Sequence, residues 1–216
     1  LGTRQAAKKI KAPLTSGQNQ SVLQVLALDL MQRKTRTFQP VEVKDLIASE
    51  LQTIVNITLT PAEFLEQVKD VSGLIVEREQ GIFEFAHLSF QEYLAAAEVK
   101  ELQQENILID NFGNSWWAET IRLYAAQSDA TNLITAALRN QTVASLTLAY
   151  DCLKESKKVE PQTQIQLENI LEAGLASKDP KIAQLAAQVK IVRRLNGLLR
   201  ISETQEIDQS YITWAE

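Results

Sequence analysis

His87 is the only histidine of the chain, and it lies between a stretch with strand signals and a stretch with helix signals. Near neutral pH an imidazole can donate a hydrogen bond, act in acid–base chemistry or hold a phosphate oxygen. On the residues alone, His87 can equally be a structural residue whose ring donates to a backbone carbonyl at a strand–helix junction. Cys152, the only cysteine, is remote from it in sequence. Both roles of His87 therefore stay open at this point.

The motifs of common catalytic sites do not occur in the 216 residues. There is no G-x-x-x-x-G-K-[ST] loop to hold phosphates and no G-x-S-x-G nucleophile elbow. A structural zinc site needs about four Cys or His ligands, which one histidine and one cysteine cannot supply. Glu77 and Glu79 are two residues apart on an expected strand, so their carboxylates would lie on the same face. We interpret this face as exposed to solvent and not as a catalytic pair. We therefore expect no enzyme activity, nucleotide hydrolysis, metal or cofactor in this chain alone.

A β-hairpin is predicted immediately before His87. Gln80 and Gly81 form a turn signal, and Gly73 suits the position that ends the preceding helix. The residues around the turn are typical of strands: Leu74, Val76, Ile82, Phe83 and Phe85. The hairpin would hold the backbone on one side of His87.

A helix is predicted immediately after His87. Ser89 and Glu92 have the S-x-x-E spacing of a capping box, in which each side chain accepts from the other residue's backbone N–H. Phe90 and Leu94 then recur at helical spacing with Ala97, and Tyr93 lies beside them. We expect this face, including both aromatic residues, to be in the core.

These two elements together carry a family resemblance. The run SGLIVER, a glycine turn and FEFAHLSFQEYLAAAE resembles the end of the winged-helix region of NACHT-type ATPases, which belong to the STAND class of signalling NTPases. The resemblance covers residues from about Asn19 to about Arg139. It implies that His87 donates to the β-phosphate of ADP in a larger protein and so locks the winged helix onto the ATPase core.

The same resemblance implies the partners and the role of the chain. The expected partner is an upstream NACHT ATPase domain in the same polypeptide, which would bind ADP or ATP with Mg. Activation would release the winged helix and allow self-oligomerisation, in cytoplasmic bacterial signalling or antiphage defence. A helical scaffold that binds a protein partner is an alternative, and a winged-helix DNA-binding regulator is another.

Residues 19–105 carry the signals of a winged-helix domain. A first helix is expected over about 21–34, and Pro40 suits the first turn of a second helix. Thr60 and Glu63 form a capping box for a third helix with Pro61 at its first position. Three helices followed by a tight hairpin is the winged-helix order.

Residues 106–200 read as an antiparallel, HEAT-like helical arm, so the fold class is mainly α. Helices are predicted from Trp116 and Trp117 through Gln127 and over 129–139, 143–155, 161–176 and 180–199, with Asp129 and Asp179 as N-caps. We expect the two tryptophans to pack the winged helix on the arm, although they can also line a peptide-binding groove.

The two ends of the chain differ in charge. Residues 1–18, the expected end of an earlier helix and a linker, carry four basic and no acidic side chains. Residues 201–216 carry four acidic and no basic side chains, and are either a linker or the start of a following module. The chain starts without methionine, which suggests a fragment of a longer protein.

Charge also bears on the function classes. Residues 19–104 hold 13 acidic and 7 basic side chains, which disfavours DNA binding because basic groups supply most of that affinity. No apolar run approaches the roughly 18 residues of a membrane span. A single cysteine fits a reducing compartment, so we expect a cytoplasmic location without contact to membrane or nucleic acid.

Overall fold

The computed structural model describes residues 14–55 and 58–195. The chain divides into two compact units, Leu1–Gln104 and Glu105–Glu216, called unit 1 and unit 2 below. The predictions for residues 1–13 and 201–216 lie outside the described residues.

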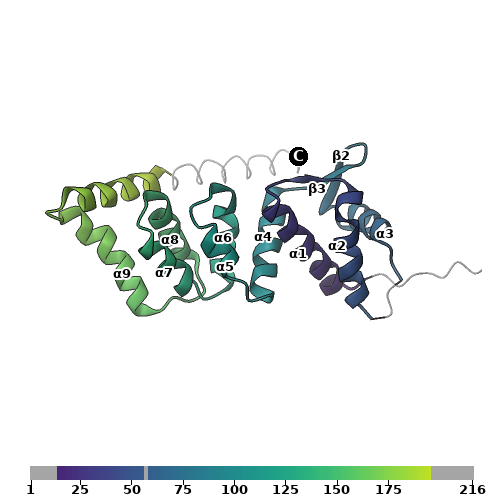
Figure 1. Ribbon diagram of the computed structural model, residues 1–216, viewed down its shortest axis with the longest axis horizontal. Coiled ribbons are helices and arrows are strands. Elements are labelled where there is room, and N and C mark those ends of the chain that lie inside the picture. The colour runs from purple at the N-terminus through teal and green to yellow at the C-terminus, as the bar shows by residue number, and fades with distance from the viewer. Residues whose placement is uncertain (1–13, 56–57, 196–216) are drawn as a thin grey trace, which may run out of the picture. The chain divides into compact units, whose positions relative to one another are not determined.

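Unit 1 has the element order of a winged helix (Figure 1). The elements are α1 (Ser16–Gln32), β1 (Thr37–Phe38), α2 (Pro40–Thr53), α3 (Pro61–Gln67), the π-helical turn η1 (Val68–Ser72), β2 (Ile75–Glu79), β3 (Ile82–Phe85) and α4 (Leu88–Glu101). The predicted order of three helices and a hairpin is confirmed. The short strand β1 was not predicted.

Local signals explain where these helices begin. The Thr60 side chain accepts from the Glu63 N–H at 3.3 Å, and the Glu63 carboxylate accepts from the Thr60 N–H at 2.9 Å, which is the predicted capping box. Pro40 starts α2, as expected. The first helix begins at Ser16 and not near residue 21, because Thr15 caps it in a capping box with Gln18.

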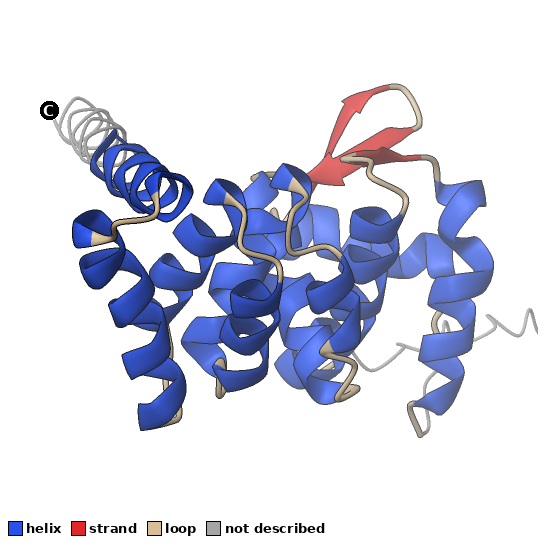
Figure 2. Cartoon of the chain, turned by 60° about the vertical axis from the view of Figure 1, so that its left-hand side comes forward, coloured by secondary structure: helices blue, strands red, loops and turns tan. Residues whose placement is uncertain are grey.

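The sheet of unit 1 is antiparallel, with strand order β1-β3-β2 (Figure 2). Ile75 pairs with Phe85, and Phe38 of β1 pairs with Phe83. The rings of Phe38 and Phe83 stack with centroids 6.0 Å apart, and both side chains are buried. Strand β1 has only two residues, which is too short for the alternating pattern of a strand to be visible in the sequence. Its apolar residue, Phe38, nevertheless anchors the strand to the core.

The core of unit 1 is centred on α1 and α4, which pack side by side. Leu26 and Leu30 of α1 are fully buried, as are Ala95 and Ala96 of α4. Small side chains on α4 let the two helices approach closely.

Unit 2 consists of short helices, which makes the fold mainly α: a winged helix followed by a helical arm. They are α5 (Asn106–Asp110), the 3₁₀ turn η2 (Ser115–Trp117), α6 (Ala118–Gln127), α7 (Thr131–Arg139), α8 (Val143–Glu155), α9 (Pro161–Glu172), the 3₁₀ turn η3 (Ala173–Ala176) and a helix over 180–195. Helix α8 packs on α6, α7 and α9.

Ion pairs and caps connect the helices of unit 2. Arg122 of α6 pairs with Glu119 and with Glu155 of α8. Asp179 accepts from the Lys181 N–H at 2.8 Å, as expected for the start of the helix over 180–195. The predicted start of α7 at Asp129 is wrong: the helix begins at Thr131, and the Asp129 carboxylate accepts from its N–H from outside the helix.

A helix that crosses a bilayer must be both long and apolar. No helix within residues 14–55 and 58–195 meets both conditions.

Candidate functional site

His87 lies at the junction between β3 and α4 of unit 1. It is the N-cap residue of α4, with extended backbone angles (φ −131°, ψ 141°), and its side chain is exposed. Its ring packs edge-on against the Phe90 ring, with centroids 5.4 Å apart and an interplanar angle of 79°. Among the described residues no hydrogen bond to the His87 ring is found, so the predicted structural role through a backbone carbonyl is not supported there.

The start of α4 differs from the prediction. We expected Ser89 and Glu92 to form a capping box, but α4 begins at Leu88 and no side chain caps it. An N-cap residue needs non-helical backbone angles, which His87 has, whereas Ser89 is already inside the first turn. Glu92 is buried along the helix at 9% exposure. The N-terminus of α4 therefore offers backbone N–H groups beside an exposed imidazole, an arrangement that favours anions.

The predicted buried face of α4 is only partly correct. Leu94 and Ala97 are buried, but Phe90 and Tyr93 are 37% and 45% exposed. The reason is rotation: α4 presents its small side chains and Gln91 to the core, which turns the two aromatic residues outward. Gly73 was predicted to end a helix. It does follow the helical turn η1, with its backbone in the left-handed region (φ 63°).

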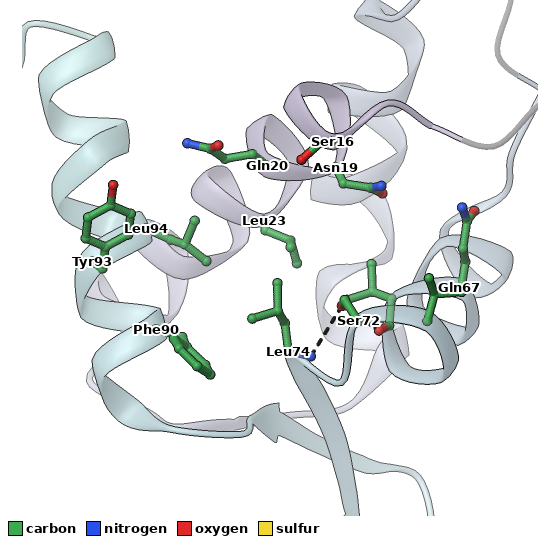
Figure 3. Close-up of a pocket in the computed structure, with 12 residues that line it drawn as sticks. Ser16, Asn19, Gln20, Leu23, Gln67, Ser72, Leu74, Phe90, Tyr93 and Leu94 are labelled. Carbon is green, nitrogen blue, oxygen red and sulfur yellow. Dashed lines mark hydrogen bonds between the residues drawn. The ribbon is translucent and has the colours of Figure 1, made fainter.

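The outward aromatic residues line a cavity of about 340 Å³, called the apolar groove below (Figure 3). Its apolar walls are formed by Leu23 of α1, Val68, Val71 and Leu74 around η1, and Phe90 and Tyr93 of α4. No charged side chain lines it. The Leu74 N–H donates to the Ser72 hydroxyl at 3.3 Å, which fixes the backbone at the groove wall. Phe90 thus contacts both the groove and the His87 ring.

Gln91 is a buried polar residue that the sequence did not reveal. Its side chain is 1% exposed, and its Nε2 donates to the Thr35 carbonyl oxygen at 3.0 Å. The same atom lies 3.5 Å from the Met31 sulfur. Gln91 therefore holds the end of α1 against the first turns of α4, and so positions the helix that carries His87.

Glu98 of α4 is a second buried polar residue that sequence reasoning missed. Burial, and after it the nearby Glu101 and Glu50 carboxylates, raise the pKa of its carboxyl from the ordinary value of 4.5 to about 7. A carboxyl in an otherwise apolar helix stripe is the signal that could have drawn attention to it. Its place in α4 indicates an effect on stability and not on ligand chemistry.

The candidate residues of unit 2 show no reactive arrangement. Trp117 is 2% exposed and Trp116 is partly exposed, but their predicted role in packing the winged helix on the arm stays a prediction. Cys152 is fully buried, and burial raises the pKa of its thiol, which keeps it protonated and unreactive. In residues 14–55 and 58–195, no group of three or more metal-ligating side chains is found.

The order α1-β1-α2-α3-β2-β3, with a sheet wing after the third helix, defines unit 1 as a winged-helix domain. More specifically, residues 3–99 match the family model described as a winged helix-turn-helix domain C-terminal to NACHT. This part of the chain thus matches the NACHT-associated winged helix that the motif around His87 predicted. No curated protein and no solved structure matched the chain in the other two comparisons.

Proposed function

We propose that this chain is the regulatory part of a NACHT-type STAND ATPase. In this proposal the winged helix holds an upstream NACHT ATPase domain in a closed, ADP-bound state, and the helical arm moves with it on activation. The family match supports the association with NACHT, since domains of this family lie C-terminal to it. Release of the winged helix would then permit self-association in cytoplasmic signalling, with bacterial antiphage defence as the proposed setting.

The observation that carries the proposal is the state of His87. Its ring is exposed, and it stands at the N-terminus of a 14-residue helix that no side chain caps. A phosphate there would meet an imidazole donor, backbone N–H groups and the positive end of the helix dipole. These three features are those expected of a contact to the β-phosphate of ADP, with Mg held by the ATPase domain.

The energy of such a contact is sufficient for a switch. A hydrogen bond to a charged group contributes about 1.5–3 kcal/mol. If it forms only in the closed state, it shifts the closed-to-open balance by that amount. Since about 1.4 kcal/mol is tenfold, removing the ring would raise the open population by roughly ten- to a hundredfold.

His87→Ala tests this proposal in the intact NACHT protein. We expect faster ADP release and oligomers without the trigger, while the 216-residue chain keeps its unfolding free energy. Gln80→Ala, an exposed change in the wing turn, is the matched control and should alter neither property. Unchanged ADP release in His87→Ala would refute the proposed contact.

A further inference from the structure

The apolar groove of unit 1 is lined entirely by uncharged side chains, and three of its apolar residues are accessible. Val71 is 81% exposed, and Phe90 and Tyr93 expose 37% and 45% of their area. In Figure 3, three leucine side chains of the groove point toward one another from different segments: Leu23, Leu74 and Leu94. Covering these side chains would remove apolar surface from water, so the groove suits an apolar occupant with no charge at its point of contact.

The helix over 180–195 in unit 2 exposes apolar side chains of this kind. One of its faces is held tightly by the arm, because Ala186 is buried and a Cβ added at Gly174 would lie 2.9 Å from the Ala186 Cβ. Ile191 and Leu195 are 59% and 54% exposed. Residues four apart lie on the same face of a helix, so these two side chains form one exposed apolar pair.

The same helix is basic. It carries four basic side chains and no acidic one over 180–195: Lys181, Lys190, Arg193 and Arg194. Lys190 and Arg194 directly precede the two residues of the apolar pair, and within residues 14–55 and 58–195 no ion pair of either is found. This end of the helix therefore combines apolar side chains with unpaired positive charge.

Unit 1 has the opposite charge. Residues 19–104 hold 13 acidic and 7 basic side chains. The stretch 61–72, which ends in the groove wall, holds three carboxylates against Lys69 alone, so it stays negative although Lys69 pairs with Glu66. Opposite net charges steer two surfaces together, and like charges disfavour their contact. The charges therefore favour contact of the groove with the basic helix over contact between two grooves.

We propose that the apolar groove binds a second copy of this chain through the helix over 180–195, with Ile191 and Leu195 inserted against Val71 and Phe90. Each copy then offers one groove and one helix, so the contact is head-to-tail and can add further copies at both ends. This inference rests on the self-association in the proposed function. It does not rest on the contact between His87 and ADP, and it is tested without nucleotide.

Sedimentation velocity of the 216-residue chain measures the association, and we expect the mass of the parent to rise with concentration. Val71→Asp and Ile191→Asp should each weaken the association at least about tenfold, because a carboxylate would be buried without a partner. Val41→Asp and Ile165→Asp are the matched controls and should associate like the parent. Val41 is 74% exposed on α2, Ile165 is 49% exposed on α9, and neither lines the groove.

Mixing the two variants distinguishes the head-to-tail contact from others. Val71→Asp keeps its helix and Ile191→Asp keeps its groove, so an equal mixture should form dimers that grow no further. A parent chain that stays monomeric would overturn the proposal, as would a mixture without dimers. Ile191→Asp that associates like the parent would assign the groove to a contact between two grooves and would also overturn it. Unchanged ADP release in His87→Ala would refute the nucleotide contact and leave this result standing.

Discussion

Gln91 joins two segments of unit 1 that are 56 residues apart in sequence. Its amide donates to the Thr35 carbonyl oxygen from a position with 1% exposure, where an apolar side chain would fit the helical period. The Thr35 carbonyl is partly buried, and a carbonyl shielded from water is costly to leave without a donor. At the residue scale, the stability of the α1–α4 contact therefore depends on a polar group and not only on apolar packing.

Replacing Gln91 by leucine tests this dependence. We expect Gln91→Leu to lower the free energy of unfolding by about 1–3 kcal/mol in urea, since the Thr35 oxygen loses its partner. Ser89→Ala, an exposed change in the same helix, should stay within about 0.5 kcal/mol of the parent because Ser89 caps nothing. Equal effects of the two changes would contradict the assigned roles of both residues.

Glu98 gives unit 1 a specific pH dependence. The pKa of its carboxyl is raised to about 7 in the folded state, from an ordinary value of 4.5. Between pH 4.5 and pH 7, folding is therefore accompanied by uptake of a proton. The stability that this carboxyl contributes is fully present below pH 4.5 and is lost as the pH rises through about 7.

The Glu98→Gln variant isolates that contribution from those of other carboxylates. We expect its unfolding free energy relative to the parent to rise from about pH 5 to about pH 8, by at most about 1.4 kcal/mol per pH unit. Urea unfolding of both proteins across this range is the measurement. Parallel stability curves would show that the Glu98 carboxyl is not perturbed.

At the scale of elements, the helices of unit 1 differ in how they start. Helix α3 is closed by reciprocal bonds between Thr60 and Glu63, and α1 by the same arrangement of Thr15 and Gln18. Helix α4 has no such closure, and its N-terminus lies beside His87. Backbone N–H groups at the start of α4 are thus available to a ligand.

Removing the cap of α3 should have a measurable cost. Thr60→Ala is expected to destabilise unit 1 by about 1 kcal/mol, because an orphan N–H of the first turn loses its acceptor. Thr60→Ser keeps a hydroxyl at the same place and serves as the matched control. If thermal unfolding of the two variants coincides, the hydroxyl contributes nothing to the helix.

At the scale of the whole molecule, the charge of the winged helix predicts that it does not bind DNA. The third helix and the turn after it carry Glu63, Glu66 and Asp70 against Lys69 alone. Lys69 is itself occupied, since its Nζ lies 2.9 Å from Glu66 and 3.6 Å from Glu77. We therefore predict that duplex DNA is not retarded by the chain in a mobility-shift assay at low salt.

A charge-reversed variant provides the positive control for that assay. Glu66→Lys combined with Asp70→Lys should increase retardation, since added basic groups release counterions from DNA. Glu63 is left unchanged because it closes the cap of α3. Tight, salt-sensitive binding by the parent chain would reverse the interpretation.

The parts of the fold that could be predicted are those with local signals. Each of these signals consists of a few neighbouring residues that mark the boundary of an element: Pro40, the Thr60–Glu63 cap and the Gln80–Gly81 turn. The two residues of β1, the burial of Gln91 and the outward rotation of Phe90 and Tyr93 depend on contacts between distant segments. His87 could be singled out from its surrounding motif, but the exposure of its ring and the missing cap beside it required the structure.

The π-helical turn Val68–Ser72 constrains how this domain can vary in length during evolution. The Gly73 N–H donates to the Val68 carbonyl oxygen five residues back, which accommodates one residue more than an α-helical turn. Losing that residue would shift β2 by one position and turn the fully buried Ile75 away from the core. The wing tip at Gln80–Gly81 has no such coupling. We therefore expect insertions and deletions among homologues to gather at the wing tip and to be absent between α3 and β2.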